Sequence, residues 1–525
     1  MRTVAFAAIA VLTLALAAPG ALAETLFQRQ GHPGAANCTT RWYTQYVDHF
    51  TFGSHPGWPE TYQQRVLTYD KYYRPGGPIF FYVGNEAPIT AFADIAGLMW
   101  QNAAEFGAAL VFAEHRFFGE SFPSCRSECM GSLSTMQAMA DYALLMTNLT
   151  SPTGLYPDSK GIITFGGSYG GMLSAWMRMK YPNLVTGAMA CSAPIGMVSP
   201  DYDTSSYWAV VTRDATAAGG AAPNCSANVH QALEDIFTMV KQPGGGEKLR
   251  ELLHLCVTPT AADANQLGYF VQASFDSMAM GNYPFPTYYI SGEPGHPAPA
   301  WPMRVACSNI ATAAPTAEER ITNLYNAISV MINITGTKQC YDTSGNNPSV
   351  FSAIWDFMVC TAGLINEQPY FPATGPPHDM FWEQPLWPKS KMEAYCERTY
   401  GKKPRWGELW MGLGLDAIPA SSNIIFANGL LDPWHSGGIL QNVSSSILAL
   451  IIPEGAHHLD LFFATPEDPP GVAEVRRTQL ANIRQWMDEA KLRGVGVHHR
   501  ETAASSHERA TFRKPTSEHL LGSRP

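Results

Sequence analysis

Charged side chains are scarce in this chain of 525 residues, because Asp, Glu, Lys and Arg together make up only 15% of it. The shortage is greatest among basic residues: 34 Lys and Arg stand against 44 Asp and Glu, which gives a formal net charge of −10 at pH 7. A nucleic-acid-binding protein needs a basic face, so the composition argues against that class. Hydrophobic residues reach 46%, which excludes global disorder. The length predicts one large domain with an insertion, or two domains.

Long hydrophobic runs are also missing after the N-terminus. Beyond residue 23, no stretch approaches the ~18 consecutive apolar residues of a membrane-spanning helix. Residues 1–23 combine a positive Arg2, an apolar run over residues 4–18 and the small-residue pattern Ala21-Leu22-Ala23. This combination predicts a cleavable signal peptide. We therefore expect a protein of the secretory pathway, lysosomal, vacuolar or extracellular, with no membrane span after cleavage.

No pair among the ten cysteines has the Cys-x-x-Cys spacing of zinc and redox sites, so we expect neither a metal nor a cofactor. All ten lie beyond the predicted cleavage site, and an oxidising compartment would allow them to form disulfides. The same compartment suits five N-glycosylation sequons, at Asn37, Asn148, Asn224, Asn333 and Asn442.

Residues 40–196 alternate between short apolar runs and helical patterns. Ile79–Val83 and Ala109–Ala113 read as strands buried on both faces of a sheet, and residues 135–146 and 171–180 read as helices. This alternation predicts an α/β fold with a mostly parallel sheet.

Residues 197–415 have a different character. Segments rich in Gly, Ala and Pro separate amphipathic helices, such as residues 226–241 and a helix opened by the capping box of Thr316 and Glu319. We interpret this region as a helical, disulfide-stapled cap insertion, since it holds six of the ten cysteines: Cys225, Cys256, Cys307, Cys340, Cys360 and Cys396.

The sheet is predicted to resume over residues 416–490. Residues 423–427 and 448–452 read as buried strands, and residues 473–490 as a helix. Residues 491–525 show no apolar periodicity and are predicted to be a disordered tail or a removable extension.

The run Gly166-Gly167-Ser168-Tyr169-Gly170-Gly171 follows an apolar strand at residues 161–165 and precedes a helix at residues 172–179. A nucleophile elbow needs this strand–turn–helix setting, with small residues beside the serine. We therefore expect Ser168 to be a nucleophile.

A serine nucleophile needs a base and an orienting carboxylate, which in this type of fold follow in the order Ser, Asp, His. Asp432 follows the strand at residues 423–427, and the adjacent His457 and His458 follow the strand at residues 448–452. The carboxyl ends of parallel strands meet at one edge of a sheet, so these side chains should converge there. Spacing alone does not choose between the two histidines.

Other candidates are weaker. Asp432 is preferred over Asp416 and Asp460, because it alone follows a strand end before the histidines. His435 is expected on a solvated rim. A tetrahedral intermediate needs two N–H donors, which we assign to Tyr169 and to Gly84 or Asn85, in the loop after Ile79–Val83.

Five motifs together resemble the family of lysosomal Pro-X carboxypeptidase and dipeptidyl peptidase II. The resemblance extends over about residues 41–490 and rests on Gly166-Gly-Ser-Tyr-Gly-Gly-Met172, Ala113-Glu-His-Arg-Phe-Phe-Gly119, Gly84-Asn-Glu86, Asn428-Gly-Leu-Leu-Asp432-Pro-Trp434 and Glu454-Gly-Ala-His-His-Leu-Asp460. It implies an α/β-hydrolase fold with a helical, disulfide-bearing cap inserted before the aspartate.

By this resemblance Ser168 is the nucleophile, Asp432 the orienting carboxylate and His457 the base. It also implies that Met172 and Trp434 line a pocket for proline and that the loop with Glu86 helps to hold a substrate terminus. The implied cap disulfides are Cys225–Cys307, Cys256–Cys340 and Cys360–Cys396.

Three positions depart from the family pattern: Ala87-Pro88 after the Gly-Asn-Glu run, Ala362 after Cys360-Thr361, and Phe462 in place of an arginine. The first leaves open which end of a peptide is held.

The function expected from the sequence is a serine exopeptidase acting after proline, either a Pro-X carboxypeptidase or a dipeptidyl peptidase, with proline-containing peptides as substrates. Two alternatives remain: a secreted binding protein that has the fold without turnover, and an esterase on the same scaffold. The esterase lacks support because no HGGG-type loop follows Ile79–Val83. The sequence leaves the oligomeric state open, a homodimer included.

Overall fold

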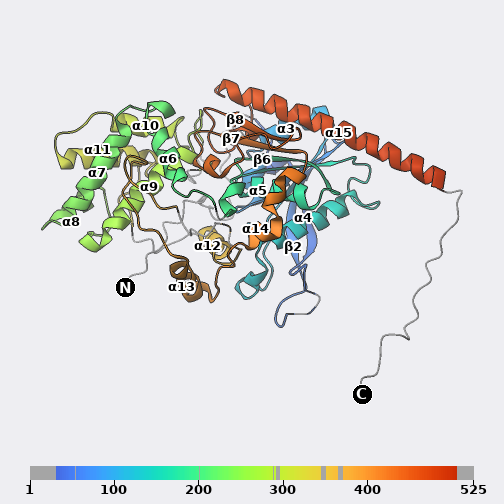
Figure 1. The fold of residues 1–525 in the computed structure, drawn as a ribbon, viewed down its shortest axis with the longest axis horizontal. Coiled ribbons are helices and arrows are strands. Elements are labelled where there is room, and N and C mark those ends of the chain that lie inside the picture. The colour runs from blue at the N-terminus through green and yellow to red at the C-terminus, as the bar shows by residue number, and fades with distance from the viewer. Residues whose placement is uncertain are drawn as a thin grey trace, which may run out of the picture.

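The computed structural model describes residues 31–504 apart from residues 52, 54, 200, 288, 291–295, 344–349, 363 and 365–370. The predicted signal peptide at residues 1–23 and residues 505–525 of the predicted tail lie outside the described residues. Figure 1 shows a cluster of helices at one end of the molecule, and the sheet with the long helix α15 at the other.

An eight-stranded sheet forms the centre of the described chain, in the order β1-β2-β4-β3-β5-β6-β7-β8. Strand β2 runs antiparallel to β1 and β4, and the other neighbours are parallel, which confirms the predicted α/β fold. The sequence did not single out β1, β2 and β6. The strands are β1 (Thr39–Tyr46), β2 (Thr61–Tyr69), β3 (Ile79–Val83), β4 (Ala109–Ala113), β5 (Ile162–Gly167), β6 (Val185–Cys191), β7 (Ile424–Gly429) and β8 (Ile447–Ile452).

The two faces of the sheet carry separate hydrophobic cores, because successive residues of a strand point to opposite faces. Phe81 and Val83 of β3 pack into the α5-side core, whose other members include Leu145 and Trp176. Phe80 and Tyr82 pack into the α15-side core, together with Trp486. The covering helices are α2 (Ile89–Ala93), α3 (Gly97–Phe106), α4 (Thr135–Thr150), α5 (Tyr169–Lys180) and α15 (Pro470–Ala504).

Helix α15 corrects the predicted start of the tail at residue 491, since it continues to Ala504. No proline occurs between Pro470 and Pro515, so nothing in this interval blocks the helix as proline would. Gly494 and Gly496 only disfavour a helix weakly.

The insertion lies between β6 and β7 and has two parts. The first has a core of its own, the cap core, which includes Leu233, Phe275 and Leu324. The second packs on the sheet, because Phe357 and Leu409 belong to the α5-side core. Its helices are α6 (Ser206–Asp214), α7 (Cys225–Met239), α8 (Gly245–Leu252), α9 (Ala264–Met280), α10 (Pro302–Asn309) and α11 (Ala317–Ile332) in the first part, and α12 (Val350–Ala362), α13 (Lys389–Tyr400) and α14 (Glu408–Leu413) in the second.

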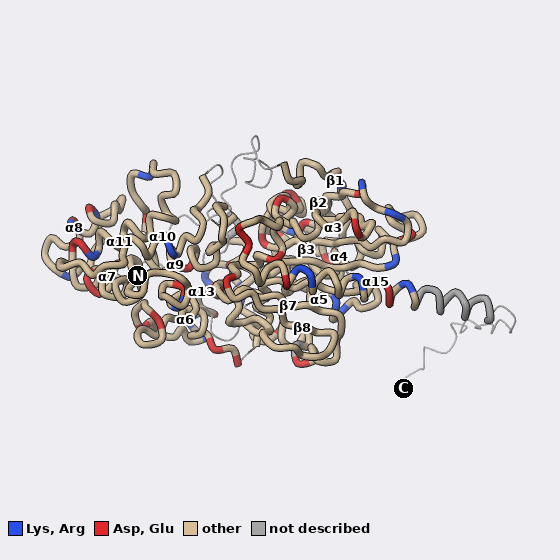
Figure 2. The backbone as a smooth tube through the Cα atoms, turned by 90° about the horizontal axis from the view of Figure 1, so that it is seen from above, with Lys and Arg blue, Asp and Glu red and all other residues tan. Residues whose placement is uncertain are grey.

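Short 3-10 helices lie in the connections. They are η1 (Ala35–Asn37), η2 (Arg126–Ser132), η3 (Ile195–Val198), η4 (Ala217–Gly219), η5 (Ala261–Asp263), η6 (Leu415–Ala420), η7 (Pro433–Gly437) and η8 (Leu459–Leu461). Thr316 and Glu319 form the predicted capping box at the start of α11. Lys and Arg are interspersed with Asp and Glu over both ends of the molecule (Figure 2).

Four disulfides occur in the described residues. Cys225–Cys307, Cys256–Cys340 and Cys360–Cys396 are the three pairs that the family resemblance implies, and Cys125–Cys129 is a fourth. Cys38 and Cys191 are free thiols, and burial raises the pKa of Cys38 to about 12. Within the described part of the chain, none of the helices is long and apolar enough to cross a membrane.

Candidate active site

Ser168 lies at a strained turn between the end of β5 and the start of α5. Its φ of 60° is in a region that a non-glycine residue rarely adopts, and its side chain is partly exposed. The backbone N–H of Ser168 donates to the carbonyl of Cys191 on β6, at 3.0 Å. A β-carbon at Gly166 would lie 2.1 Å from the carbonyl oxygen of Gly170, so only glycine allows strand and helix to pass this closely. The geometry is that of a nucleophile elbow.

Asp432 and His457 meet at the carboxyl ends of β7 and β8. His457 Nδ1 lies 2.8 Å from Oδ2 of Asp432, and both side chains are almost completely buried. The other oxygen, Oδ1, accepts a hydrogen bond from the backbone N–H of Trp434 at 3.1 Å. A carboxylate can only accept, so Nδ1 carries the ring proton and Nε2 is left with its lone pair.

Backbone hydrogen bonds hold the two loops together. The N–H of Leu431 donates to the carbonyl of Gly455, and that of Leu430 to the carbonyl of Ile452, each at 2.9 Å. A β-carbon at Gly429 would lie 2.2 Å from the carbonyl oxygen of Gly455. The close approach of these backbones explains why Asp432 and His457 converge although 25 residues separate them.

The adjacent His458 faces a different environment from His457. Its backbone is left-handed, with φ 40° and ψ 42°, and its N–H donates to Ser192 Oγ at 2.7 Å. Its Nε2 lies 3.1 Å from the hydroxyl of Tyr289, and its ring stacks on Phe462. Burial, together with the neighbouring His457, lowers the pKa of His458 well below its usual value. The two histidines therefore differ in their partners: His457 contacts Asp432, whereas His458 contacts Tyr289. Spacing in the sequence did not distinguish them.

The other acidic candidates are placed elsewhere. Asp416 is exposed in η6. Asp460 is buried, and its Oδ2 accepts a hydrogen bond from Gln479 Nε2 at 2.6 Å. The expectation of a solvated His435 is wrong, because its side chain is buried, and its Nδ1 lies 2.6 Å from the Asp432 carbonyl oxygen. Burial lowers the pKa of His435.

One of the expected oxyanion donors is not available. The N–H of Gly84 donates to the carbonyl of Ala113 at 3.0 Å, and its carbonyl accepts from the hydroxyl of Tyr142 at 2.7 Å. Gly84 as a donor is therefore wrong, since β3 and β4 use its N–H. As the first residue of α5, Tyr169 has an N–H without an intrahelical acceptor. Asn85 remains the candidate for the second donor.

The residues that hold the Tyr169 side chain were not predicted to have a role. Its hydroxyl lies 3.3 Å from His115 Nε2 and 3.0 Å from Thr135 Oγ1, and its ring packs edge-on against Trp355 of α12. Burial lowers the pKa of His115 to about 4, so this imidazole is neutral above that pH. The position of His115 just after a parallel strand, inside one of the quoted motifs, could have identified it.

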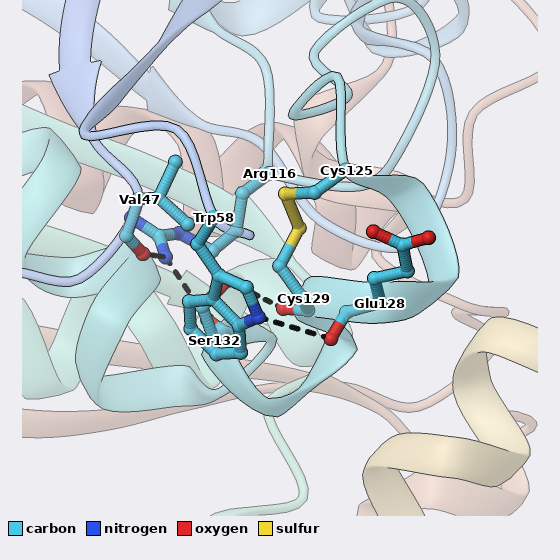
Figure 3. The surroundings of a disulfide bond; sticks show 7 residues. All are labelled: Val47, Trp58, Arg116, Cys125, Glu128, Cys129 and Ser132. Atoms are coloured by element: carbon cyan, nitrogen blue, oxygen red, sulfur yellow. Dashed lines mark hydrogen bonds between the residues drawn. A yellow bond between two sulfur atoms is a disulfide. The ribbon is translucent and has the colours of Figure 1, made fainter. Parts of the chain in front are cut away.

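The next residue of that motif, Arg116, is structural. Its guanidinium forms a fully buried ion pair with Asp141, with Nε 2.7 Å from Oδ2. It also donates to the carbonyls of Val47 and Ser132, next to the Cys125–Cys129 disulfide (Figure 3). These contacts connect the loops that follow β1 and β4 to the end of η2.

The residues implied to bind substrate lie in different surroundings. Met172 is buried in the α5-side core. Trp434 is half-buried and packs against the α15-side core and the cap core. Glu86 is buried, which raises its pKa, and hydrogen bonds from its own backbone and from the Asn85 side chain oppose that shift. The pocket itself stays a prediction.

Four of the sequon asparagines, Asn37, Asn148, Asn224 and Asn442, are exposed, and Asn333 is partly exposed. Glycosylation at these five positions stays a prediction.

Comparisons with known proteins agree with this architecture. The sequence pattern of the family described as serine carboxypeptidase S28 matches residues 45–479. Lysosomal Pro-X carboxypeptidase of Bos taurus is 34% identical over 463 residues, which cover 86% of this chain and 89% of the relative. The Mus musculus protein of that name is 35% identical over 455 residues, covering 85% and 88%. Prolyl carboxy peptidase like protein 5 of Caenorhabditis elegans is 33% identical over 444 residues, covering 80% and 84%.

These matches span the sheet and the insertion alike, so the protein is a serine peptidase acting on peptides, with an α/β-hydrolase fold. The chain belongs to the serine carboxypeptidase S28 family.

Proposed function

We propose that this protein is an exopeptidase that cleaves the peptide bond after proline, with Ser168 as nucleophile, His457 as base and Asp432 as the orienting carboxylate. The buried 2.8 Å contact between His457 Nδ1 and Asp432 Oδ2 carries the proposal, because it holds the imidazole in the tautomer that a general base requires. Ser168 is partly exposed at its elbow, as a nucleophile must be.

The reaction follows from these roles. Ser168 Oγ attacks the carbonyl carbon of the prolyl residue while its proton passes to His457 Nε2. The C–N bond then breaks, the leaving amine takes that proton, and an acyl-enzyme remains. A water molecule gives its proton to His457, adds to the acyl carbon and releases the product, and Ser168 Oγ recovers the proton.

Two backbone N–H groups are proposed to stabilise the oxyanion. Tyr169 N–H lies next to the nucleophile at the start of α5, where the helix dipole also favours negative charge. Asn85 lies in the loop after β3 and supplies the second donor. His115 and Thr135 support this role, since they fix the side chain of the Tyr169 donor.

Met172 and Trp434 are proposed to line a pocket that selects proline, as the family resemblance implies. The relatives named Pro-X carboxypeptidase support release of a C-terminal residue over release of an N-terminal dipeptide. Burial raises the pKa of Glu86 and so favours its protonated form at acidic pH, in which it can donate a hydrogen bond to a substrate carboxylate.

A lysosomal or extracellular location is proposed on three grounds. They are the leader at residues 1–23, the four disulfides and the five sequons.

Parallel assays test the function. The protein is incubated with an N-blocked peptide ending in Pro-X and with a free-amine X-Pro reporter. We expect cleavage of the first. Cleavage of the X-Pro reporter alone would assign a dipeptidyl peptidase instead.

Two further measurements address the other classes. Hydrolysis of a short acyl ester with neither peptide cleaved would indicate an esterase. A protein that a fluorophosphonate probe does not label would be a silent binding protein, whereas Ser168→Ala should abolish labelling of an active one.

A further inference from the structure

One segment of the insertion leaves the cap core and enters the core of the sheet. Met278 and Ala279, at the end of α9, belong to the cap core. Met280 and Tyr283, directly after them, belong to the α15-side core and are almost completely buried. We call residues 280–283 the clasp.

The clasp binds both backbone polar groups of His457. The N–H of His457 donates to the carbonyl of Met280 at 3.2 Å, and its carbonyl accepts from the hydroxyl of Tyr283 at 3.0 Å. These two bonds fix the peptide units on both sides of the imidazole, and so the direction in which the ring leaves the backbone.

The insertion also holds the loop of Asp432. Trp434 Nε1 donates to Met280 Sδ at 2.8 Å. On the other side of Asp432, Arg213 of α6 donates to the carbonyl of Leu430. Ser168 differs, because its backbone is held by β6 and by its own helix.

We propose that the clasp positions the acid–base half of the triad, with Tyr283 as a positioning residue for His457. The inference rests on the triad proposed above. The hydroxyl of Tyr283 binds the backbone of the base rather than a reacting atom. It keeps Nδ1 directed at Asp432, so that Nε2 on the opposite side of the ring stays free for the proposed nucleophile.

Tyr283→Phe tests the proposal, because it removes the hydroxyl and keeps the ring that packs against Phe285 and Phe462. We expect kcat for the peptide substrate to fall about fivefold to tenfold, as for loss of one buried hydrogen bond that aligns the base. KM should stay within about twofold, because substrate contacts are unchanged.

Tyr395→Phe is the matched control. It removes a tyrosine hydroxyl of the same insertion, one that donates to Asp356 Oδ2 at 2.8 Å, beside the Cys360–Cys396 disulfide. We expect kcat and KM to remain at their original values.

A double-mutant cycle separates positioning from general structural support. With an activated ester, residual turnover is measured for His457→Ala and for His457→Ala combined with Tyr283→Phe. If Tyr283 acts through the base, adding its substitution to His457→Ala has no further effect.

The outcomes distinguish the two proposals. Full turnover by His457→Ala would overturn the proposed triad. If His457→Ala loses turnover but kcat of Tyr283→Phe is unchanged, the positioning role alone is overturned. The same holds if adding Tyr283→Phe to His457→Ala lowers the residual turnover further.

Discussion

The imidazole of His458 lies against the backbone of Gly167, so closely that a β-carbon at Gly167 would lie 2.6 Å from His458 Cδ2. Gly167 directly precedes Ser168, so the ring of His458 packs against the backbone of the turn that holds Ser168. Phe462 holds the ring from another side, with the ring centroids 5.7 Å apart. Of the two adjacent histidines, only His457 has Asp432 as its partner, and the two therefore differ in what their removal should do.

Substitution of the two histidines should affect turnover unequally. Ser168→Ala and His457→Ala should each lower kcat by roughly 10⁴-fold or more, because members of a triad act as a unit. His458→Ala should cost less, since it removes packing and not a proton acceptor. Turnover per folded molecule, with the unfolding midpoint of each variant as control, checks this. A greater loss for His458→Ala at equal folded yield would contradict the assignment.

Trp434 should determine the preference for proline. A proline ring adds about three methylenes over glycine, each worth roughly 0.8 kcal/mol when buried, so the preference should be about 2 kcal/mol, or about 30-fold in kcat/KM. Trp434→Ala should erase most of it while fluorophosphonate labelling of Ser168 persists.

Trp434→Phe is a second variant that tests the two contacts of Trp434 separately. It retains an aromatic face and loses the N–H that donates to Met280 Sδ. It should keep the proline preference and lower kcat. An unchanged preference in Trp434→Ala would mean that the pocket is formed by other residues.

His115 should make the fold sensitive to acid. Burial lowers its pKa from 6.5 to about 4, so between these values the unfolded chain binds a proton that the folded protein does not. Folding stability from this group is fully present above pH 6.5 and is lost as the pH falls toward 4, by about 3 kcal/mol. His115→Gln should flatten that dependence in urea unfolding between pH 4 and 7, whereas His296→Gln, at an exposed position, should not.

A disulfide that closes a longer loop should stabilise the protein more, because it removes more conformational entropy from the unfolded chain. Cys225–Cys307 spans 82 residues, so replacing both cysteines by Ala should lower the free energy of unfolding by roughly 2–4 kcal/mol. Cys125–Cys129 spans four residues, and its removal should cost less. Urea unfolding under non-reducing conditions compares the two variants. Equal losses would show that loop length does not govern the effect.

The sheet and its carboxyl edge could be predicted because local patterns determine them. The apolar runs of β3, β4, β5, β7 and β8 have no polar face, and Ser168 is flanked by glycines that only a tight strand–helix turn requires. Asp432 and the pair His457 and His458 then followed from chain order, since parallel strands end at one edge. The choice of His457 within that pair came from the family resemblance.

The remaining features depend on contacts between distant residues. Strand β1 lies at the sheet edge and exposes most of its residues, so it lacks a clean apolar run. Strand β2 lacks one because it buries polar side chains, Gln64 and Arg65 among them. The N–H of Gly84 was predicted to be free for the oxyanion. In the structure it donates to the carbonyl of Ala113 on β4. Met280 and Tyr283 carry no motif: their role comes from meeting His457, more than 170 residues away.

The chain order of the site has a consequence for biosynthesis. A ribosome releases β5 and Ser168 first, then the insertion with its three disulfides, and only afterwards β7, Asp432, β8 and His457. A nascent chain that has released only the proposed nucleophile and the insertion still lacks both the proposed base and its orienting carboxylate. With the proposed triad, the polypeptide is therefore unable to cleave neighbouring peptides until translation is nearly complete.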